Sequence, residues 1–81
     1  MPACEFGSGK DGDGGTEVEI MSPLSVQYCV HLCYQMGGNG LTMRNNGILD
    51  TCWCEKSMDT QKDNPKYKSC FFGKFCYIFS V

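Results

Sequence analysis

The chain has 81 residues and a formal net charge of −2, with seven cysteines and ten glycines. This length allows one domain, residues 1–81, and its core is too small to stabilise the fold without covalent cross-links. The near balance of charge excludes the dominant basic face of a nucleic-acid-binding or membrane-lytic protein, and no run of about 20 apolar residues is present to span a membrane.

Glycine dominates residues 7–15, where five of the nine positions are glycine. This composition predicts a flexible loop. Asp11 and Asp13 have the spacing that opens a calcium-binding loop, but Gly15 and Ser22 stand where such a loop needs ligand side chains. We therefore predict neither a metal site nor a cofactor.

The next segment, residues 16–21, alternates acidic with apolar side chains and ends before Pro23, which predicts an extended strand. A strand of this kind can add to the edge of a partner's sheet, and its glutamates would speed association with a basic partner. We predict that it is the partner-binding site, formed by Glu17, Val18, Glu19, Ile20 and Met21. The alternative is an ordinary edge strand, with its apolar side chains packed inward and its glutamates solvated.

Residues 25–36 are compatible with two structures. Alternating side chains rich in β-branched and aromatic types favour a strand, which is our prediction. The alternative is a helix over about 23–36, because a serine–proline pair precedes this segment and a glycine follows it. In the helix, Cys29 and Cys33 would lie one turn apart on the same face.

Residues 41–54 predict a hairpin, because two extended segments flank an Asn-Asn-Gly turn signal. Cys52 and Cys54 would project from one face of its second strand. Residues 55–65 are polar without a period and predict a loop, and residues 66–81 predict a further strand.

Together these segments predict a small disulfide-rich, mainly β domain built as an antiparallel sheet with hairpins. The alternative fold is a cystine-stabilised α/β domain, with a helix at about 23–36 and the hairpin 41–54. The cysteine spacing provides neither the two close pairs of a zinc site nor the C-x-x-C of a redox enzyme. We therefore expect disulfides and a secreted, extracellular protein, in which an odd count of cysteines leaves one thiol over.

The order of the cysteines resembles that of the class A evasins, which are cysteine-rich salivary proteins of ticks. An acidic stretch follows Cys4 and leads to C-x-x-x-C at Cys29 and Cys33. An Asn-Gly pair then precedes Cys52, and Cys-Phe-Phe-Gly-Lys-Phe-Cys follows at residues 70–76. The chain departs from the family in its extra Cys54, in lacking the last two family cysteines, and in lacking the usual glycosylation sites.

This resemblance implies that Cys4 pairs with Cys33 and Cys29 with Cys76, while three other cysteines compete for the third bridge. The residue extra to the family pattern, Cys54, is the candidate free thiol. The disulfide-forming residues are then expected to be Cys4, Cys29, Cys33, Cys52, Cys70 and Cys76.

A second resemblance is to the cystine-stabilised αβ group of scorpion toxins and defensins. In that group C-x-x-x-C lies on a helix and C-x-C on the last strand of a hairpin. The resemblance implies bonds between Cys29 and Cys52 and between Cys33 and Cys54. The chain departs from the group where Gly40-Leu41-Thr42 replaces a G-x-C sequence.

No set of residues indicates catalysis, because the chain has one histidine, no phosphate-binding loop and no convincing pair of carboxylates. We predict a secreted, non-catalytic binding protein and not an enzyme. The tick resemblance implies that it sequesters or inhibits a host defence protein, a chemokine or a complement component. We expect an extracellular host protein as the partner, no nucleic acid, no membrane insertion, and a monomer. The alternative is an ion-channel toxin or defensin-like peptide.

Overall fold

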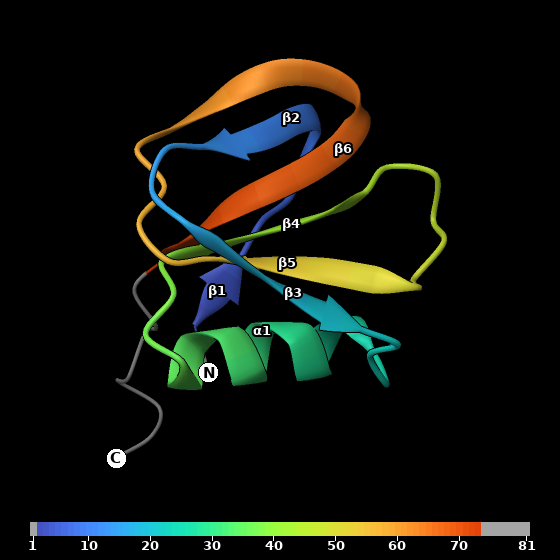
Figure 1. Cartoon of the computed structure of the whole chain (residues 1–81). Helices are drawn as coiled ribbons and strands as arrows, with labels where there is room; N and C mark the ends of the chain where they lie inside the picture. The colour runs from blue at the N-terminus through green and yellow to red at the C-terminus, as the bar shows by residue number, and fades with distance from the viewer. Residues whose placement is uncertain (1, 74–81) are drawn as a thin grey trace.

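The computed structural model describes residues 2–73, which form six strands and one helix (Figure 1). The prediction of a small disulfide-rich, mainly β fold with an antiparallel sheet is confirmed. In chain order the elements are β1 (Ala3–Cys4), β2 (Gly7–Asp13), β3 (Glu17–Met21), α1 (Val26–Gln35), β4 (Gly40–Arg44), β5 (Thr51–Glu55) and β6 (Thr60–Gly73).

The strands lie in the order β1-β6-β4-β5-β3, and β2 also pairs with β6. Every pair is antiparallel. The 14-residue strand β6 is long enough to reach β1, β2 and β4 along its length. β5 lies between β4 and β3, and β3 forms one edge of the sheet.

β2 and the first part of β6 bend out of the sheet together. Their pairing shifts register after Ser8, which leaves residues 64–67 of β6 opposite Gly9 alone. Extra residues on one strand bend it and increase its twist. Beyond the shift, residues 10–13 and 60–63 form a two-stranded ribbon, called the flap below, that arches over the sheet on the side away from α1 (Figure 1).

These strands correct two predictions. Residues 7–13 are not a loop, because pairing with β6 holds them extended in spite of their glycines. Residues 60–65 also belong to a strand, so the loop predicted for residues 55–65 ends at residue 59, six residues early. The predicted strand 66–81 is confirmed as far as Gly73, and its remainder lies outside the described residues.

α1 shows that the strand prediction for residues 25–36 is wrong and that the helix alternative is right. Ser25 caps the helix with extended backbone, and its hydroxyl oxygen accepts a hydrogen bond of 3.0 Å from the Tyr28 backbone N–H. Gly37 follows the last turn with a φ of 83°, a left-handed conformation that suits glycine after a helix.

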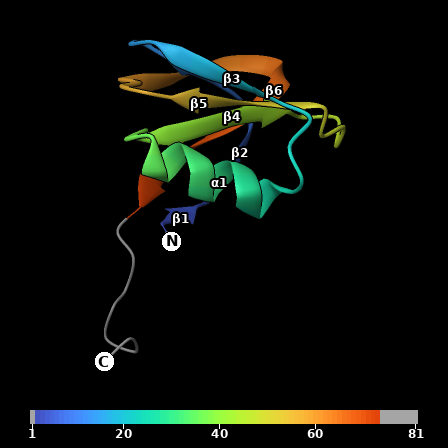
Figure 2. The ribbon, with the colours of Figure 1, turned by 60° about the horizontal axis from the view of Figure 1, so that its bottom comes forward.

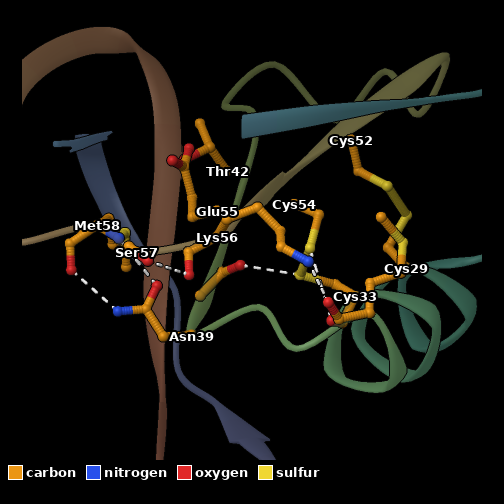
Figure 3. The surroundings of a disulfide bond; sticks show 12 residues. Cys29, Cys33, Asn39, Thr42, Cys52, Cys54, Glu55, Lys56, Ser57 and Met58 are labelled. Carbon is orange, nitrogen blue, oxygen red and sulfur yellow. Dashed lines mark hydrogen bonds between the residues drawn. A yellow bond between two sulfur atoms is a disulfide. The ribbon is translucent and has the colours of Figure 1, made fainter. Parts of the chain in front are cut away.

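Two disulfides attach α1 to β5 and explain why the helix forms (Figure 3). Cys29 bonds to Cys52 and Cys33 bonds to Cys54, with Cα separations of 6.5 and 5.2 Å. In a strand Cys29 and Cys33 would be about 13 Å apart, whereas one helical turn separates them by about 6 Å, close to the spacing of Cys52 and Cys54 on β5. The helix lies along β4 and β5 and buries Cys29, Val30 and Cys33 against them (Figure 2).

The disulfides correct the pairing implied by the tick resemblance. Cys54 is bonded and buried, so its assignment as the free thiol is wrong. Cys33 and Cys29 are likewise not available to Cys4 and Cys76, and the third disulfide joins Cys4 to Cys70. The helix-to-strand pairs are those of the cystine-stabilised αβ resemblance. Cys76, predicted to form a disulfide, lies outside the described residues.

Half-cystines make up most of the core. Five of the nine residues in the buried apolar cluster are cysteines, and the other four are Ile20, Val30, Leu41 and Met43. Such a core buries little aliphatic surface, so the covalent bridges carry much of the stability.

We expect replacement of both Cys33 and Cys54 by alanine to lower the free energy of unfolding by roughly 3 kcal/mol, from the loop of 21 residues that their bond closes. The matched replacement of Cys4 and Cys70, whose separation is 66 residues, is expected to cost about 4 kcal/mol. Urea unfolding of the oxidised proteins measures both values. Unfolding free energies that stay unchanged would contradict the assignment of stability to these bridges.

Candidate functional site

The flap and the sheet face beneath it enclose a pocket of about 360 Å³. This face is the one opposite α1, because cysteines and apolar residues of β4 and β5 occupy the helix side. The Gly12 backbone N–H of the flap donates a 3.2 Å hydrogen bond to the Thr42 hydroxyl on β4, which holds the flap over the sheet. Residues of five strands and of the turn after β2 line the pocket: Asp11, Gly12, Asp13, Gly14, Gly15, Glu17, Thr42, Trp53, Glu55, Lys62 and Tyr67.

Glu55 lies at the centre of this arrangement. It ends β5, its cross-strand neighbours are Glu17 and Gly40, and only 2% of its surface is exposed. The Thr42 hydroxyl donates to Glu55 Oε2 at 2.7 Å, and the two side chains are seen together in Figure 3. A Cβ atom on Gly12 would approach the Glu55 carboxyl carbon to 2.8 Å, so a side chain at this position would displace the carboxylate that β2 crosses.

Burial raises the pKa of the Glu55 carboxyl from its ordinary 4.5 to about 7. The hydrogen bond from Thr42 acts in the opposite direction, because it favours the ionised form. The neighbouring carboxyl of Glu17 raises the pKa further through a shared hydrogen bond and like charge, and Asp11 adds to the repulsion. Glu55 therefore exchanges a proton near neutral pH inside a pocket that already holds other carboxylates.

Aromatic rings form another wall of the pocket. Trp53 on β5 and Tyr67 on β6 pack edge to face, with ring centroids 5.7 Å apart. Outside the pocket lining, the Arg44 guanidinium lies 5.4 Å from the Trp53 ring centroid and pairs with Asp50 at 2.7 Å. One cation lines the pocket itself: Lys62, whose Nζ is 3.6 Å from Asp13 and whose side chain is more than half exposed.

Asn39 fixes the segment that connects β5 to the flap (Figure 3). Its side chain donates to the Met58 carbonyl at 2.9 Å and accepts from the Met58 N–H at 3.0 Å. Its backbone N–H also donates to the Glu55 carbonyl, and its carbonyl accepts from the Phe72 N–H. Met58 is buried beside Gly12 and Gly40, so Asn39 holds this connecting segment against the sheet and next to β2.

The edge strand β3 borders the pocket through Glu17. Within residues 2–73, β3 pairs with β5 and with no other strand. The Lys56 N–H donates to the Thr16 carbonyl, and the Ser22 N–H donates to the Asp50 carbonyl. Along an antiparallel edge strand, the backbone groups of successive residues point alternately toward the neighbouring strand and toward the open edge. Because Thr16 and Ser22 bond toward β5, the other even-numbered residues of this segment do so as well. The N–H and C=O groups of Glu17, Glu19 and Met21 therefore point to the open edge.

The structure places the five predicted binding residues on one strand but in three environments. Glu17, Glu19 and Met21 have their side chains on the pocket side of the sheet, and 71% of Met21 is exposed. Val18 faces the helix side and is 39% exposed. Ile20 is 9% exposed and packs in the core, so its side chain cannot fill a pocket on a partner.

Sequence reasoning missed the pocket. Trp53 and Glu55 alternate with Cys52 and Cys54 along one strand, so the bonded cysteines fix them on the opposite face. That alternation was the signal available in the sequence. The approach of Thr42 to Glu55 follows from the pairing of β4 with β5, whereas that of Asp11 depends on the bend of the flap, which no local pattern indicates.

The arrangement can hold a cation and share a proton. No protein-family model, curated protein or solved structure matches the chain. Across residues 2–73, no helix has the length and apolar character needed to cross a bilayer.

The Glu55 pKa predicts a pH-dependent stability. Asp11, Glu17 and Thr42 face Glu55 from the three neighbouring strands. Between about pH 4.5 and pH 7 the folded protein keeps a proton on Glu55 that the unfolded chain releases. The free energy of unfolding should therefore fall as the pH rises through this range and level off above it.

Urea titrations from pH 4.5 to 8 measure this slope, and Glu55→Gln is expected to remove it because the amide does not titrate. Asp50 and Asp63 have pKa values lowered below 3.8 by their ion pairs, so they titrate outside the range. Equal slopes for the wild type and Glu55→Gln would contradict the assignment.

Proposed function

We propose that the protein is a secreted, non-catalytic binding protein that captures a basic host defence protein by adding one of its strands to the open edge of β3. The observation that carries this proposal is the row of outward backbone groups at Glu17, Glu19 and Met21. Strand addition uses such groups for affinity and the alternating side chains for specificity. The host-defence target, a chemokine or a complement component, is the expectation given by the tick resemblance.

The charge of β3 supports a basic partner. An exposed edge strand can pair with a second copy of itself, and natural proteins prevent this with charged side chains. Two copies of β3 would bring their own glutamates together, whereas a basic strand would meet Glu17 and Glu19 with opposite charge. The same charges support a monomer and fast capture of a cationic target.

Exposed apolar side chains extend this surface at the end of β3. Met21, Leu24 and Ile48 are 71, 85 and 57% exposed. Their segments meet where the Ser22 N–H donates to the Asp50 carbonyl, at the end of the sheet where α1 begins (Figure 1). Methionine and large apolar residues supply the desolvated centre of interfaces, while charged residues form the rim.

Secretion and lack of catalysis belong to the same proposal. Three disulfides are typical of an oxidising compartment. A framework closed by disulfides also reduces the entropy lost when the edge is ordered by a partner. His31 is exposed on α1, on the other side of the sheet from the pocket carboxylates, so the one imidazole of the chain cannot act together with them.

A second candidate function, an ion-channel toxin or defensin-like peptide, is favoured by the disulfide pattern alone. Cys29–Cys52 and Cys33–Cys54 are the bonds that the cystine-stabilised αβ resemblance implies. A toxin or defensin would need a free cationic face. Here Lys56 donates to the Met36 carbonyl and Lys62 pairs with Asp13, so the binding-protein proposal accounts for more of the surface.

Proline at position 19 tests the open edge. The Glu19 N–H points away from β5, so Glu19→Pro should leave the β3–β5 ladder intact and yet remove a donor that a partner strand needs. We expect capture from a panel of chemokines and complement components, measured by biolayer interferometry, to weaken at least roughly tenfold. Glu19→Gln should slow association by roughly threefold at low salt and leave dissociation unchanged.

Val18→Pro is the matched control, because it removes a hydrogen bond to β5 and should lower the melting temperature where Glu19→Pro does not. Capture by Glu19→Pro with wild-type rates would overturn the edge-pairing proposal. Block of a channel by the wild type, with no capture across the panel, would favour the toxin alternative.

A further inference from the structure

We infer that the pocket between the flap and the sheet binds a guanidinium group. Its volume of about 360 Å³ lies within the range of small-ligand sites. Four carboxylates line it, from Asp11 and Asp13 on the flap, Glu17 on β3 and Glu55 on β5, against the single ammonium of Lys62. This inference does not depend on the capture of a partner strand by β3.

The buried Glu55 carboxylate points to a missing donor. Only 2% of this residue is exposed, and within residues 2–73 the Thr42 hydroxyl is the donor recorded for it, bonded to Oε2. No buried side-chain oxygen in this part of the chain lacks a partner, so Oε1 is reached from the pocket and not sealed in the protein. Its neighbour there is the carboxyl of Glu17, and a second acceptor cannot satisfy it without a proton.

The missing donor also explains the elevated pKa of Glu55: among residues 2–73, no positive charge is found to compensate the burial of this carboxyl. A cation placed between Glu17 and Glu55 would supply that charge and the missing hydrogen bonds. Charge-assisted bonds of this kind are about twice as strong as neutral ones.

The shape of the pocket favours guanidinium over a metal ion. Within the described residues, no three of these carboxylates converge as metal ligands would. Guanidinium is planar, donates to two carboxylates at once, and stacks on aromatic faces. Trp53 and Tyr67 line the pocket beside the carboxylates, and the Trp53 ring already holds one guanidinium, that of Arg44, 5.4 Å from its centroid. Lys62 is largely exposed and 3.6 Å from Asp13, so a ligand displaces it at little cost.

Trp53 is the only tryptophan in the chain, so its fluorescence reports on the pocket directly. The oxidised full chain is titrated at pH 7.5 and low salt with butylguanidinium, and with butylurea as its neutral isostere. We expect a saturable change in Trp53 emission with butylguanidinium alone, accompanied by shifts of the Gly12, Gly14 and Gly15 amides in two-dimensional NMR spectra. No saturation, or an equal response to butylurea, would overturn the inference; so would a saturable response to CaCl₂ in place of butylguanidinium.

Carboxylate variants locate the site. Glu55→Gln and Glu17→Gln should each weaken butylguanidinium binding roughly tenfold, because each removes one charged acceptor. Glu17 is exposed, so its variant tests the inference even if Glu55→Gln alters folding. Glu19→Gln is the matched control: it removes the same charge from the same strand face, outside the pocket lining, and should change binding less than about twofold. Equal losses of affinity in Glu17→Gln and Glu19→Gln would show that butylguanidinium is attracted by the net negative charge of the strand and not bound in the pocket, which would overturn the inference.

A guanidinium group reaches the pocket either as a small molecule or as an arginine side chain of a protein. An acetyl-Gly-Arg-Gly-amide peptide and its citrulline counterpart distinguish these sources. Tighter binding of the arginine peptide than of butylguanidinium supports a protein side chain as the occupant, and weaker binding supports a small molecule. Binding of the citrulline peptide as tight as that of the arginine peptide would contradict recognition of the charge.

Discussion

The rest of the structure depends on the two disulfides between α1 and β5. They form together because one turn of a helix and two residues of a strand advance by nearly the same distance. Cys29 and Cys33 are one helical turn apart, about 6 Å along the axis, and Cys52 and Cys54 are two strand residues apart, about 6.7 Å. Because the two steps are nearly equal, both bonds form with the helix lying along the strand. A Cβ atom on Gly38 would overlap the sulfurs of Cys33 and Cys54, so the turn after the helix also depends on this pair.

These bonds determine which side chains of β5 lie on each face of the sheet. With Cys52 and Cys54 bonded to the helix, Trp53 and Glu55 must lie on the opposite face, beneath the flap. Disulfides supply stability that a larger apolar core would otherwise provide. The second face is thus free to hold a buried carboxylate and a polar pocket, at a cost that an uncross-linked domain of this size would not tolerate.

Local patterns predicted the strands whose side chains alternate with burial. The alternation of residues 16–21 gave β3, and the turn signal before Ile48 gave the β4–β5 hairpin. For residues 25–36 the same alternation of side chains led to a wrong strand prediction. An alternating pattern does not show which cysteines form disulfides, and those disulfides make the helix favourable here. There the cysteine spacing was the better guide, since C-x-x-x-C and C-x-C match only when the first lies on a helix.

The flap and the pocket depend on contacts that are distant in sequence. Glycine does not favour a strand by its own conformational preference. At position 12 its lack of a side chain lets β2 pass close to the carboxyl group of Glu55, which is 43 positions later in the sequence. The pocket carboxylates come from three strands whose relative positions follow from the register shift in β2 and β6. Composition placed the acidic residues near the N-terminus, but only the topology brings them to Glu55.

The disulfide map tests the central claim most directly. The adjacent cysteines are separated by cleavage after Leu32 and Trp53, under acidic conditions that prevent exchange, and the linked peptides are identified by mass spectrometry. The account predicts Cys29–Cys52, Cys33–Cys54 and Cys4–Cys70. Recovery of Cys4 linked to Cys33, or of Cys54 alkylated in the native protein, would contradict this prediction. The second helix-to-strand bond would then be absent, and the reason for placing Trp53 and Glu55 on the pocket face would no longer hold.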